Sequence, residues 1–436
     1  MTQKATITPI KSLHGRIIPP GDKSISHRAL MLGALAQGKT VIRGLLRGED
    51  CLCTLKALQA MGIAIEDQGD EVIVHGGGLW GLKEPEDVLD MGNSGTSTRL
   101  LTGILACQSF FSVLTGDSSL RRRPMNRVIE PLRLMGAQIW GRGGGNYAPL
   151  AINGKVELQP IQFKLKQSSA QVKSALLLAG LYAGGVTQVL EPHPSRDHTE
   201  RMLKAMGANI YREDSTVILE GQPTLQGLEI DVPGDFSSAA FFIAAALIVP
   251  DAELTIERVG LNPTRIGFLE AVQQMGGQIE IVREYRVGEE PVGDLWVKSS
   301  HLKGINIEGE MVPRMIDEFP IFAVLAAVAE GETVIRQAAE LRVKESDRIG
   351  RLAAELRKAG VKVEEYEDGM VISGGTHFKG ANFTSHGDHR LAMSMAIGAL
   401  IAKKDSHIED VACVQTSFPG FFDLLAGLTG QEIPVT

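Results

Sequence analysis

The stretch LKALQAMGIAI (residues 55–65) has apolar residues at helical spacing up to Gly62. After this glycine it continues into alternating apolar residues. Glycine commonly follows the last turn of a helix because it adopts the left-handed conformation without strain, so the stretch predicts a helix and then a strand. Five further stretches share the pattern: PLRLMGAQIW (131–140), MLKAMGANIY (202–211), LEAVQQMGGQI (269–279), LRKAGVKVEE (356–365) and the degraded FFDLLAGLTGQEI (421–433). The glycines of the first five copies are 74, 71, 69 and 84 residues apart. A period of about 70 is too long for an ordinary solenoid and indicates a repeated supersecondary unit.

The longest interval between these glycines, from Gly276 to Gly360, contains the polar stretch from Arg283 to Asp294, which we interpret as an inserted hairpin.

Each copy also has an earlier segment so rich in small and apolar residues that a helix there must be buried on nearly all sides. These segments are HRALMLGALAQG (27–38), STRLLTGILACQ (97–108), VKSALLLAGLYAGG (172–185), SSAAFFIAAALIV (237–249), FPIFAVLAAVAEG (319–331) and HRLAMSMAIGALIA (389–402). Each unit therefore reads strand, buried helix, strand, exposed amphipathic helix, strand, and six units predict an α/β fold of two three-unit domains.

The residues before the buried helices carry the chemistry, and we call these segments the lead-ins. They are GDKSISHR (21–28), GNSGTSTR (92–99), SSAQVK (168–173), GDFSS (234–238), DEFP (317–320) and GDHR (387–390). A helix N-terminus attracts anions through unpaired N–H groups and the positive end of the dipole. Ordinary N-capping selects the same Ser, Asp, Asn and Gly residues. A Lys or Arg expected in the first turn of four of the six copies favours ligand binding.

Composition limits the class of protein. Hydrophobic content of 44% and charged content of 22% are globular values, and no apolar run is long enough to span a membrane without Gly or charge. MTQKATITPI lacks the apolar region of a signal peptide, so we expect a cytoplasmic protein that does not bind membranes. The net charge of -8 argues against a nucleic-acid partner. Four Cys residues without paired spacing and the lack of a nucleotide-binding fingerprint predict neither a metal nor a cofactor.

Eight motifs together resemble the 5-enolpyruvylshikimate-3-phosphate synthase family of enolpyruvyl transferases, also called 3-phosphoshikimate 1-carboxyvinyltransferases. They are GDKSISHRAL (21–30), GNSGTSTRLL (92–101), RRRPMNRVIEPL (121–132), SSAQVKSALLLAGL (168–181), DHTERML (197–203), KESDRI (344–349), GDHRLAM (387–393) and TSFPGF (416–421). The resemblance implies two inverse α/β prism domains, each of three βαβαββ repeats, with the active site in the cleft between them. It implies that residues 21–234 form the first domain, and that 1–20 with 235–436 form the second.

The resemblance also implies the reaction, which moves the enolpyruvyl group of phosphoenolpyruvate to the 5-hydroxyl of shikimate 3-phosphate in aromatic amino acid biosynthesis. Two anionic substrates in one site explain why the motifs contain so many Lys and Arg residues, because charge-assisted contacts can offset the repulsion between the substrates. The expected ligands of shikimate 3-phosphate are Ser24, Arg28, Ser169, Gln171 and Arg196. Those of phosphoenolpyruvate are Lys23, Arg123, Arg348 and Arg390, with Asn93, Gly95 and Thr96 at its pocket and Lys344 beside the reacting groups. For Arg121 and Arg122 a solvated loop is the simpler interpretation.

Asp317 and Glu345 match the family's two carboxylates and, with Lys23, are the candidate catalytic groups. The base must take a proton from the 5-hydroxyl, and the acid must supply one to the methylene carbon of phosphoenolpyruvate. A carboxyl group that donates a proton at neutral pH needs burial or anionic neighbours. As a structural alternative, Asp317 would be a helix N-cap and Glu345 a surface ion-pair partner. The sequence leaves open how Asp317, Glu345, Lys23 and Lys344 share the proton transfers.

One departure concerns Thr416, which stands where many family members have a Lys before Thr-Phe-Pro. One cationic ligand of phosphoenolpyruvate is then absent from its usual place. UDP-N-acetylglucosamine enolpyruvyl transferase is the nearest alternative, but the loop GDSSLRRRP (116–124) lacks that family's reactive Cys. RNA 3'-phosphate cyclase would need a nucleic-acid face, and a non-catalytic anion-binding relative would not need intact carboxylates. We expect a monomer and a target of glyphosate.

Overall fold

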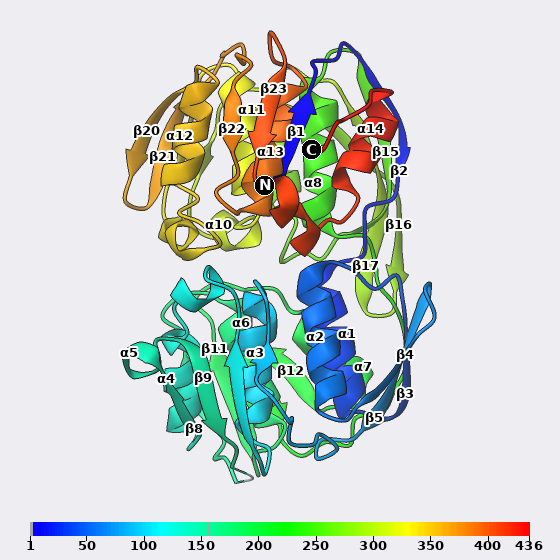
Figure 1. Cartoon of the computed structure of the whole chain (residues 1–436), viewed down its shortest axis with the longest axis vertical. Helices are drawn as coiled ribbons and strands as arrows, with labels where there is room; N and C mark the ends of the chain where they lie inside the picture. Colours follow the sequence, from blue (N-terminus) through cyan, green and yellow to red (C-terminus); the bar gives the residue numbers. More distant parts are fainter. Residues whose placement is uncertain (1–2, 156) are drawn as a thin grey trace. The chain divides into compact units, whose positions relative to one another are not determined.

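The computed structural model describes residues 3–155 and 157–436, and these divide into two compact units (Figure 1). Unit 1 contains the N-terminal segment up to Pro20 together with Pro233–Tyr285 and Pro291–Thr436. Unit 2 contains Gly21–Val232 and Arg286–Glu290. The chain thus passes from one unit to the other after Pro20 and after Val232.

The second repeat of unit 2 gives the plainest view of the building block. In chain order it contains β6 (Leu89–Asp90), α3 (Gly95–Leu105), β7 (Phe111–Thr115), α4 (Asn126–Leu134), β8 (Gln138–Gly141) and β9 (Tyr147–Asn153). Its sheet has the order β6-β7-β9-β8, with β6 parallel to β7 and the other two pairs antiparallel. The crossover from β6 to β7 passes through the buried helix α3, as parallel pairing requires. The βαβαββ repeat expected from the sequence is confirmed.

The other two repeats of unit 2 follow the same plan. The third contains β10 (Gln162–Lys164), α6 (Ala170–Gly180), β11 (Val186–Leu190), α7 (His198–Ala205), β12 (Ile210–Glu213) and β13 (Thr216–Glu220). The first contains α1 (Lys23–Leu35), β3 (Gln37–Arg43), α2 (Glu49–Ala60), β4 (Ala64–Asp67) and β5 (Glu71–Gly77). Its leading strand is β14 (Glu229–Asp231), which comes from the end of the unit and pairs parallel to β3.

Unit 1 repeats the plan with an exchanged strand of its own. Its first repeat contains α8 (Phe236–Ile248), β15 (Ala252–Gly260), α9 (Gly267–Gln274), β16 (Gln278–Val287) and β17 (Glu290–Lys298), led by β2 (Leu13–Ile17) parallel to β15. Its second contains β18 (Asn306–Ile307), α11 (Phe319–Val328), β19 (Glu332–Ile335), α12 (Gly350–Lys358), β20 (Lys362–Tyr366) and β21 (Gly369–Ser373). Because β2 precedes α1 and β14 precedes α8 in the chain, each unit is completed by a strand next to a crossing point.

The last repeat of unit 1 is closed by both ends of the chain. It contains β22 (Asn382–Thr384), α13 (His389–Ala399), β23 (Ser406–Glu409), α14 (Phe421–Thr429) and the N-terminal β1 (Lys4–Ile7). β1 pairs antiparallel with β23, and Ala5 forms a bridge with Val435. The remaining short segments are α5 (Arg142–Gly145), α10 (Met311–Arg314) and 3-10 turns at Leu120–Arg122, Ala339–Val343 and Val411–Thr416.

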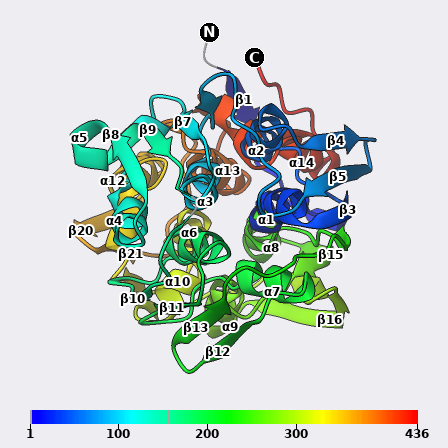
Figure 2. The same cartoon turned by 90° about the horizontal axis from the view of Figure 1, so that it is seen from below.

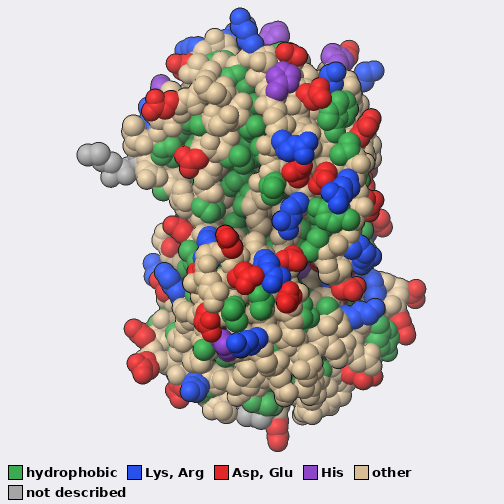
Figure 3. Space-filling model, turned by 90° about the vertical axis from the view of Figure 1, so that its right-hand side faces the viewer, with side chains coloured by type: hydrophobic (Ala, Val, Ile, Leu, Met, Phe, Trp, Pro, Cys, Tyr) green, Lys and Arg blue, Asp and Glu red, His purple; other side chains and the backbone are tan. Residues whose placement is uncertain are grey.

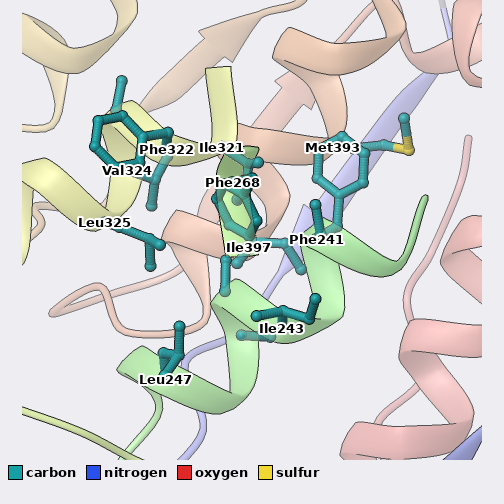
Figure 4. Packing of buried hydrophobic residues seen from close by; sticks show 14 of the residues in the cluster. Phe241, Ile243, Leu247, Phe268, Ile321, Phe322, Val324, Leu325, Met393 and Ile397 are labelled. Carbon is teal, nitrogen blue, oxygen red and sulfur yellow. The ribbon is translucent and has the colours of Figure 1, made fainter. Parts of the chain in front are cut away.

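The core of each unit is built from helices rather than from facing sheets. In unit 2, the strands lie around the outside of α1, α3 and α6 (Figure 2). In unit 1, α8, α11 and α13 pack together with Phe241, Phe322 and Ile397 among their contacts (Figure 4). Small residues allow this close approach, since a methyl group at Gly103 would lie 2.3 Å from the carbonyl oxygen of Ala175. The burial predicted for these helices is confirmed.

The polar insertion in the fourth repeat is the hairpin predicted from its sequence. Strands β16 and β17 are neighbours in the sheet β16-β17-β15-β2. The tip, Arg286–Glu290, belongs to unit 2, where His198 Nδ1 lies 2.7 Å from Glu290 Oε1. Within residues 3–155 and 157–436, no helix is both long enough and apolar enough to cross a membrane.

The helix packing of unit 2 predicts a large effect of a single methyl group. We expect Gly103→Ala to destabilise the protein by about 1–3 kcal/mol, because α3 and α6 would have to move apart. The control is Gly427→Ala in α14, where a methyl group meets no atom within 4 Å. That change should be neutral or stabilise by about 0.5–1 kcal/mol through the unfolded chain. Scanning calorimetry measures both, and equal melting temperatures for the two variants would contradict the packing argument.

Candidate functional site

The six lead-ins begin the six buried helices, and side chains cap five of them. Each capping oxygen accepts a backbone N–H of the first turn: Asp22 from Ile25 (2.9 Å), Ser94 from Ser97 (3.1 Å), Ser169 from Val172 (3.5 Å), Asp235 from Ser237 (2.6 Å) and Asp388 from Arg390 (2.9 Å). Helix α11 instead follows Glu318, whose side chain makes no capping bond. Asp317 is therefore not the N-cap that its position before an apolar helix allowed.

The expectation of a Lys or Arg in the first turn of four helices is wrong for two of them. Lys23 is the first residue of α1 and Arg390 the second of α13, as expected. Arg99 is the fifth residue of α3 and Lys173 the fourth of α6, because these helices begin at Gly95 and Ala170, two residues earlier than the segments expected from the sequence. Arg99 is 4% exposed and Lys173 is completely buried.

Lys23 forms an ion pair that the sequence analysis missed. Its Nζ lies 2.5 Å from Oδ2 of Asp50, the second residue of α2, and Asp50 is 5% exposed. Lys23 is itself 17% exposed at its side chain. An acidic residue in the first turn of a helix is ordinary, so Asp50 carried no separate signal in the sequence. Ser24, the next residue of α1, accepts a hydrogen bond from Arg28 Nη1 at its carbonyl oxygen (2.9 Å).

Arg123 and Asn93 are brought together at the start of α3. The Arg123 guanidinium donates to the carbonyl oxygen of Asn93 at 3.0 Å and also to its side-chain oxygen. Asn93 Nδ2 in turn donates to Asp117 at 2.7 Å. A methyl group at Gly95 would lie 2.6 Å from Arg99 Nη1 and 3.3 Å from Arg123 Nη1. Gly95 therefore leaves room for two guanidinium groups, and its backbone is that of an ordinary first helical residue.

Gln171 joins the second lead-in to the third. Its Oε1 accepts from Arg99 Nη1 at 2.8 Å, and its Nε2 donates to Thr96 Oγ1 at 3.1 Å. Ser169, two residues earlier, caps the helix that carries Gln171. Thr96 and Gln171 thus belong to one hydrogen-bonded group, with Arg99 as a member that the sequence analysis did not assign.

Arg28, an expected ligand of shikimate 3-phosphate, is almost completely buried. It is 4% exposed, and its guanidinium donates to Thr199 Oγ1 (2.7 Å) and Ser174 Oγ (2.8 Å). These contacts connect α1, α6 and α7. Arg196, half-buried, lies on the segment between β11 and α7, three residues before Thr199.

A second group of buried hydrogen-bonded side chains connects α1, α2 and α3. His27 Nδ1 lies 2.7 Å from Thr54 Oγ1, and Thr54 lies 2.6 Å from Ser97 Oγ. Burial, with the positive charges of Lys23 and Arg28, holds the pKa of His27 well below its ordinary value. His27 is therefore neutral at physiological pH and serves as a hydrogen-bonding part of the scaffold.

In unit 1, the predicted residues gather around Arg348, which is 1% exposed. Its guanidinium lies 2.7 Å from Glu345 Oε2, 2.9 Å from Asp388 Oδ2 and 3.4 Å from Asp317 Oδ1. Arg390 Nη1 donates to the carbonyl oxygen of Asp317 at 3.0 Å. Two candidate catalytic carboxylates therefore share one buried cation, and Glu345 is not the surface ion-pair member of the structural alternative.

Charge pairing sets the protonation of this group. Burial by itself lowers the pKa of Arg348, but the carboxylates of Asp388, Glu345 and Asp317 outweigh it and raise that pKa. Burial raises the pKa of Asp388, while the charge of Arg348 brings it below its ordinary value. Asp388 is thus held ionised, as helix cap and as partner of Arg348.

Two further sequence expectations concern Lys344 and Thr416. Lys344 Nζ lies 3.2 Å from Glu340 Oε1, while its neighbour Glu345 contacts Arg348. The Thr416 hydroxyl donates to the carbonyl oxygen of Cys413 at 2.8 Å and lies 3.3 Å from His389 Nδ1. Thr416 thus supplies a packed hydroxyl where many relatives of the resembled family have a cation.

No group of three or more His, Cys, Asp or Glu side chains suited to a metal ion occurs among residues 3–155 and 157–436. On the face in Figure 3, Lys and Arg side chains are interspersed with Asp and Glu. Lys23 and Arg390 stand in the first turns of the buried helices α1 and α13. The fold defines a class of α/β proteins built from six related repeats, five of them βαβαββ, whose buried helices begin at polar or charged side chains.

Comparison with known proteins identifies the family within this class. The sequence model described as "EPSP synthase (3-phosphoshikimate 1-carboxyvinyltransferase)" matches residues 7–425. A curated protein named 3-phosphoshikimate 1-carboxyvinyltransferase from Geobacter metallireducens is 56% identical over 97% of this chain and 98% of its own length. One of the same name from Citrifermentans bemidjiense is 54% identical over 98% and 99%. A solved structure of EPSP synthase from Acinetobacter baumannii matches all of both chains with a TM-score of 0.88 and 47% identity. The chain belongs to the EPSP synthase family.

The buried Arg348–Asp388 pair predicts a strong and pH-dependent contribution to stability. Asp388→Asn should cost about 3–5 kcal/mol, because it leaves a buried guanidinium short of one partner. The control, Asp368→Asn, breaks the more exposed pair with Arg336 and should cost less than about 1 kcal/mol.

The pH dependence follows from the depressed pKa of Asp388. Its stabilisation is present above the unfolded-state pKa of about 4 and is lost as the pH falls through the lower folded-state pKa. The difference in melting temperature between wild type and Asp388→Asn should therefore be constant near neutral pH and shrink in acid. A difference that grows on acidification would contradict this assignment.

Proposed function

We propose that this chain transfers the enolpyruvyl group of phosphoenolpyruvate to the 5-hydroxyl of shikimate 3-phosphate, releasing inorganic phosphate. Membership of the EPSP synthase family supports the proposal. The geometric observation that carries it is the pair of carboxylates, Asp317 and Glu345, on the single guanidinium of Arg348. Such a pair can take up and supply protons beside an anion that the neighbouring cations attract.

The binding roles follow the resemblance and the chemistry of the side chains. Hydroxyl, amide and guanidinium groups of unit 2 bind the phosphate and ring hydroxyls of shikimate 3-phosphate: Ser24, Arg28, Ser169, Gln171 and Arg196. Cationic groups bind phosphoenolpyruvate, with small residues lining its pocket: Lys23, Arg123, Lys344, Arg348 and Arg390, with Asn93, Gly95 and Thr96. Charge-assisted contacts of this kind contribute roughly 1.5–3 kcal/mol each.

The chemical step needs three proton movements. As the 5-hydroxyl oxygen bonds to C2 of phosphoenolpyruvate, a base takes the hydroxyl proton and an acid protonates C3, which gives a tetrahedral intermediate. The intermediate then loses phosphate from C2 and a proton from C3, which restores the double bond. We assign these transfers to Asp317 and Glu345, with Lys23 beside the reacting groups.

The cluster in unit 1 supports a protonated carboxyl group. Arg348 and Arg390 carry two positive charges, whereas Asp317, Glu345 and Asp388 carry three negative charges when ionised. An anionic substrate adds further negative charge and raises the pKa of the nearest carboxyl group. Asp388 is held ionised by Arg348, so the added proton goes to Glu345 or Asp317.

We further propose that the enzyme works in the cytoplasm as a monomer. Both substrates carry several charges and cross a lipid bilayer only at high cost, which places the reaction where they are made. Sedimentation at working concentration tests the monomer.

The decisive assay measures phosphate release with phosphoenolpyruvate and either shikimate 3-phosphate or UDP-N-acetylglucosamine as acceptor. We expect release with shikimate 3-phosphate alone. Release only with the sugar nucleotide would favour the alternative transferase, and release with neither would favour a non-catalytic anion-binding protein.

Carboxylate variants separate chemistry from binding. Asp317→Ala and Glu345→Ala should each lower kcat by roughly 100-fold or more. Arg196→Ala should instead raise the KM for shikimate 3-phosphate with little change in the KM for phosphoenolpyruvate. Glu364→Ala, which removes an exposed carboxylate of the same unit, is the control and should keep normal kinetics. Near-normal kcat in both carboxylate variants would mean that the proton carriers are assigned wrongly.

Gly95→Ala tests the edge of the phosphoenolpyruvate pocket. The nearest atoms to the added methyl group are the guanidinium ends of Arg99 and Arg123 and not backbone atoms, so the fold should tolerate it. A narrowed pocket penalises glyphosate, an elongated anion, more than the shorter phosphoenolpyruvate. We expect the glyphosate inhibition constant to rise by a larger factor than the KM for phosphoenolpyruvate. Equal increases in the two constants would refute the role of Gly95 as a pocket wall.

A further inference from the structure

Unit 2 contains a fully buried ammonium group that the proposed reaction does not use. Lys173, the fourth residue of α6, has no exposed surface. Its Nζ lies 2.9 Å from Glu191 Oε2 and 2.7 Å from Glu200 Oε1. Arg212 Nη1 also reaches Glu191 Oε2 at 3.2 Å. The two cations, Lys173 and Arg212, are thus paired with two carboxylates near the start of α6.

The network holds one residue of the segment between β11 and α7 at two points. Lys173 Nζ donates to the carbonyl oxygen of Ser195 at 3.1 Å. The hydroxyl of Ser195 donates to Glu191 Oε1, the other oxygen of the carboxylate that pairs with Lys173. Backbone and side chain of Ser195 are both fixed, and the next residue in the chain is Arg196.

The same segment has a second anchor on the third lead-in. Ser168 Oγ donates to the carbonyl oxygen of His193 at 2.6 Å and accepts from the His193 N–H at 3.0 Å. Ser168 and Lys173 flank the start of α6, which also carries Ser169 and Gln171. The segment with Arg196 is thereby tied at residues 193 and 195 to the helix start that holds two other proposed ligands.

We infer that Lys173 is a positioning residue for Arg196, which it acts on through Ser195 and Glu191. The inference rests on the proposed role of Arg196 in binding shikimate 3-phosphate. Burying an ammonium group is costly unless it is paired, and an apolar side chain of similar volume would fill the same space without that cost. The paired charges here converge on Ser195, which fixes the backbone from which the Arg196 guanidinium extends.

This arrangement makes a specific kinetic expectation. A backbone already ordered in the free enzyme loses less entropy when the ligand binds, so affinity for the phosphate of shikimate 3-phosphate is higher. The chemical step depends on Asp317 and Glu345, which belong to unit 1. Loss of Lys173 should therefore weaken the binding of shikimate 3-phosphate and leave kcat and the KM for phosphoenolpyruvate nearly unchanged.

The first experiment compares Lys173→Met with Glu200→Gln in the full chain. Both variants disturb the buried ion network, but Glu200 has no contact with Ser195 among those observed. We expect Lys173→Met to raise the KM for shikimate 3-phosphate about tenfold and Glu200→Gln to change it less than about twofold. Equal effects of the two variants on this KM would overturn the inference, because a general loss of stability would then explain both.

A double-mutant cycle tests whether Lys173 acts through Arg196. In the Arg196→Ala background, Lys173→Met should add less than about a twofold further increase in the KM for shikimate 3-phosphate. An increase as large as in the wild-type background would overturn the inference. If Lys173→Met does not fold, the pair Lys173→Met/Glu200→Gln, which removes a carboxylate together with the ammonium, replaces it in the same cycle.

These experiments distinguish failure of the inference from failure of the proposals on which it rests. A wild-type enzyme that releases no phosphate with shikimate 3-phosphate would overturn the proposed function and the inference with it. A normal KM for shikimate 3-phosphate in Arg196→Ala would overturn the assignment of that ligand. Additive effects of Lys173→Met and Arg196→Ala, with both other results as expected, would overturn the role of Lys173 alone.

Discussion

The fold depends on six helices that are buried on nearly every side. The N–H groups in the first turn of such a helix still need hydrogen-bond acceptors, and polar side chains of the lead-ins supply them in place of water. Asp22, Ser94, Ser169, Asp235 and Asp388 accept these bonds. Each lead-in thus brings polar and charged side chains to the end of an otherwise apolar helix. Of these five capping residues only Ser169 is also a proposed ligand, so capping and the proposed anion binding are mostly divided between neighbouring residues of the lead-ins.

Carboxylates limit how much positive charge these helix starts present. Lys23 is paired with Asp50, and Arg348 is shared by Asp388, Glu345 and Asp317. A guanidinium without partners in so buried a place would be costly. Pairing keeps the cations ionised and oriented. In the proposed reaction an anionic substrate would compete with a carboxylate for the same donor and raise the pKa of the displaced carboxyl group, which would link binding to proton transfer.

Much of the fold could be predicted from the sequence because its period and burial pattern are local properties. The glycines at the helix ends and the small-residue helices gave the repeat, and the insertion from Arg283 to Asp294 proved to be a hairpin. The helix starts were harder to predict, since α3 and α6 begin at Gly95 and Ala170, two residues before the expected segments. That displacement turns Arg99 and Lys173 inward. The partners Asp50 and Asp388 could not be found from spacing, because ion pairs between elements far apart in the chain depend on packing.

The two units use buried charge in comparable ways. In unit 2, Lys173 and Glu191 hold Ser195, the residue before Arg196. In unit 1, Ser237 donates to Glu318, the residue after Asp317, and Arg265 donates to Ser237 at 2.9 Å. In both cases a hydrogen-bonded group with charged members includes the residue next to the proposed functional residue, Ser195 beside Arg196 and Glu318 beside Asp317. The functional side chain itself makes other contacts. A side chain that binds a ligand or exchanges a proton keeps more of its hydrogen-bonding capacity when a neighbouring residue fixes the backbone. Buried ions one residue away separate these roles, and this separation gives the costly burial of Lys173 and Arg265 a physical purpose.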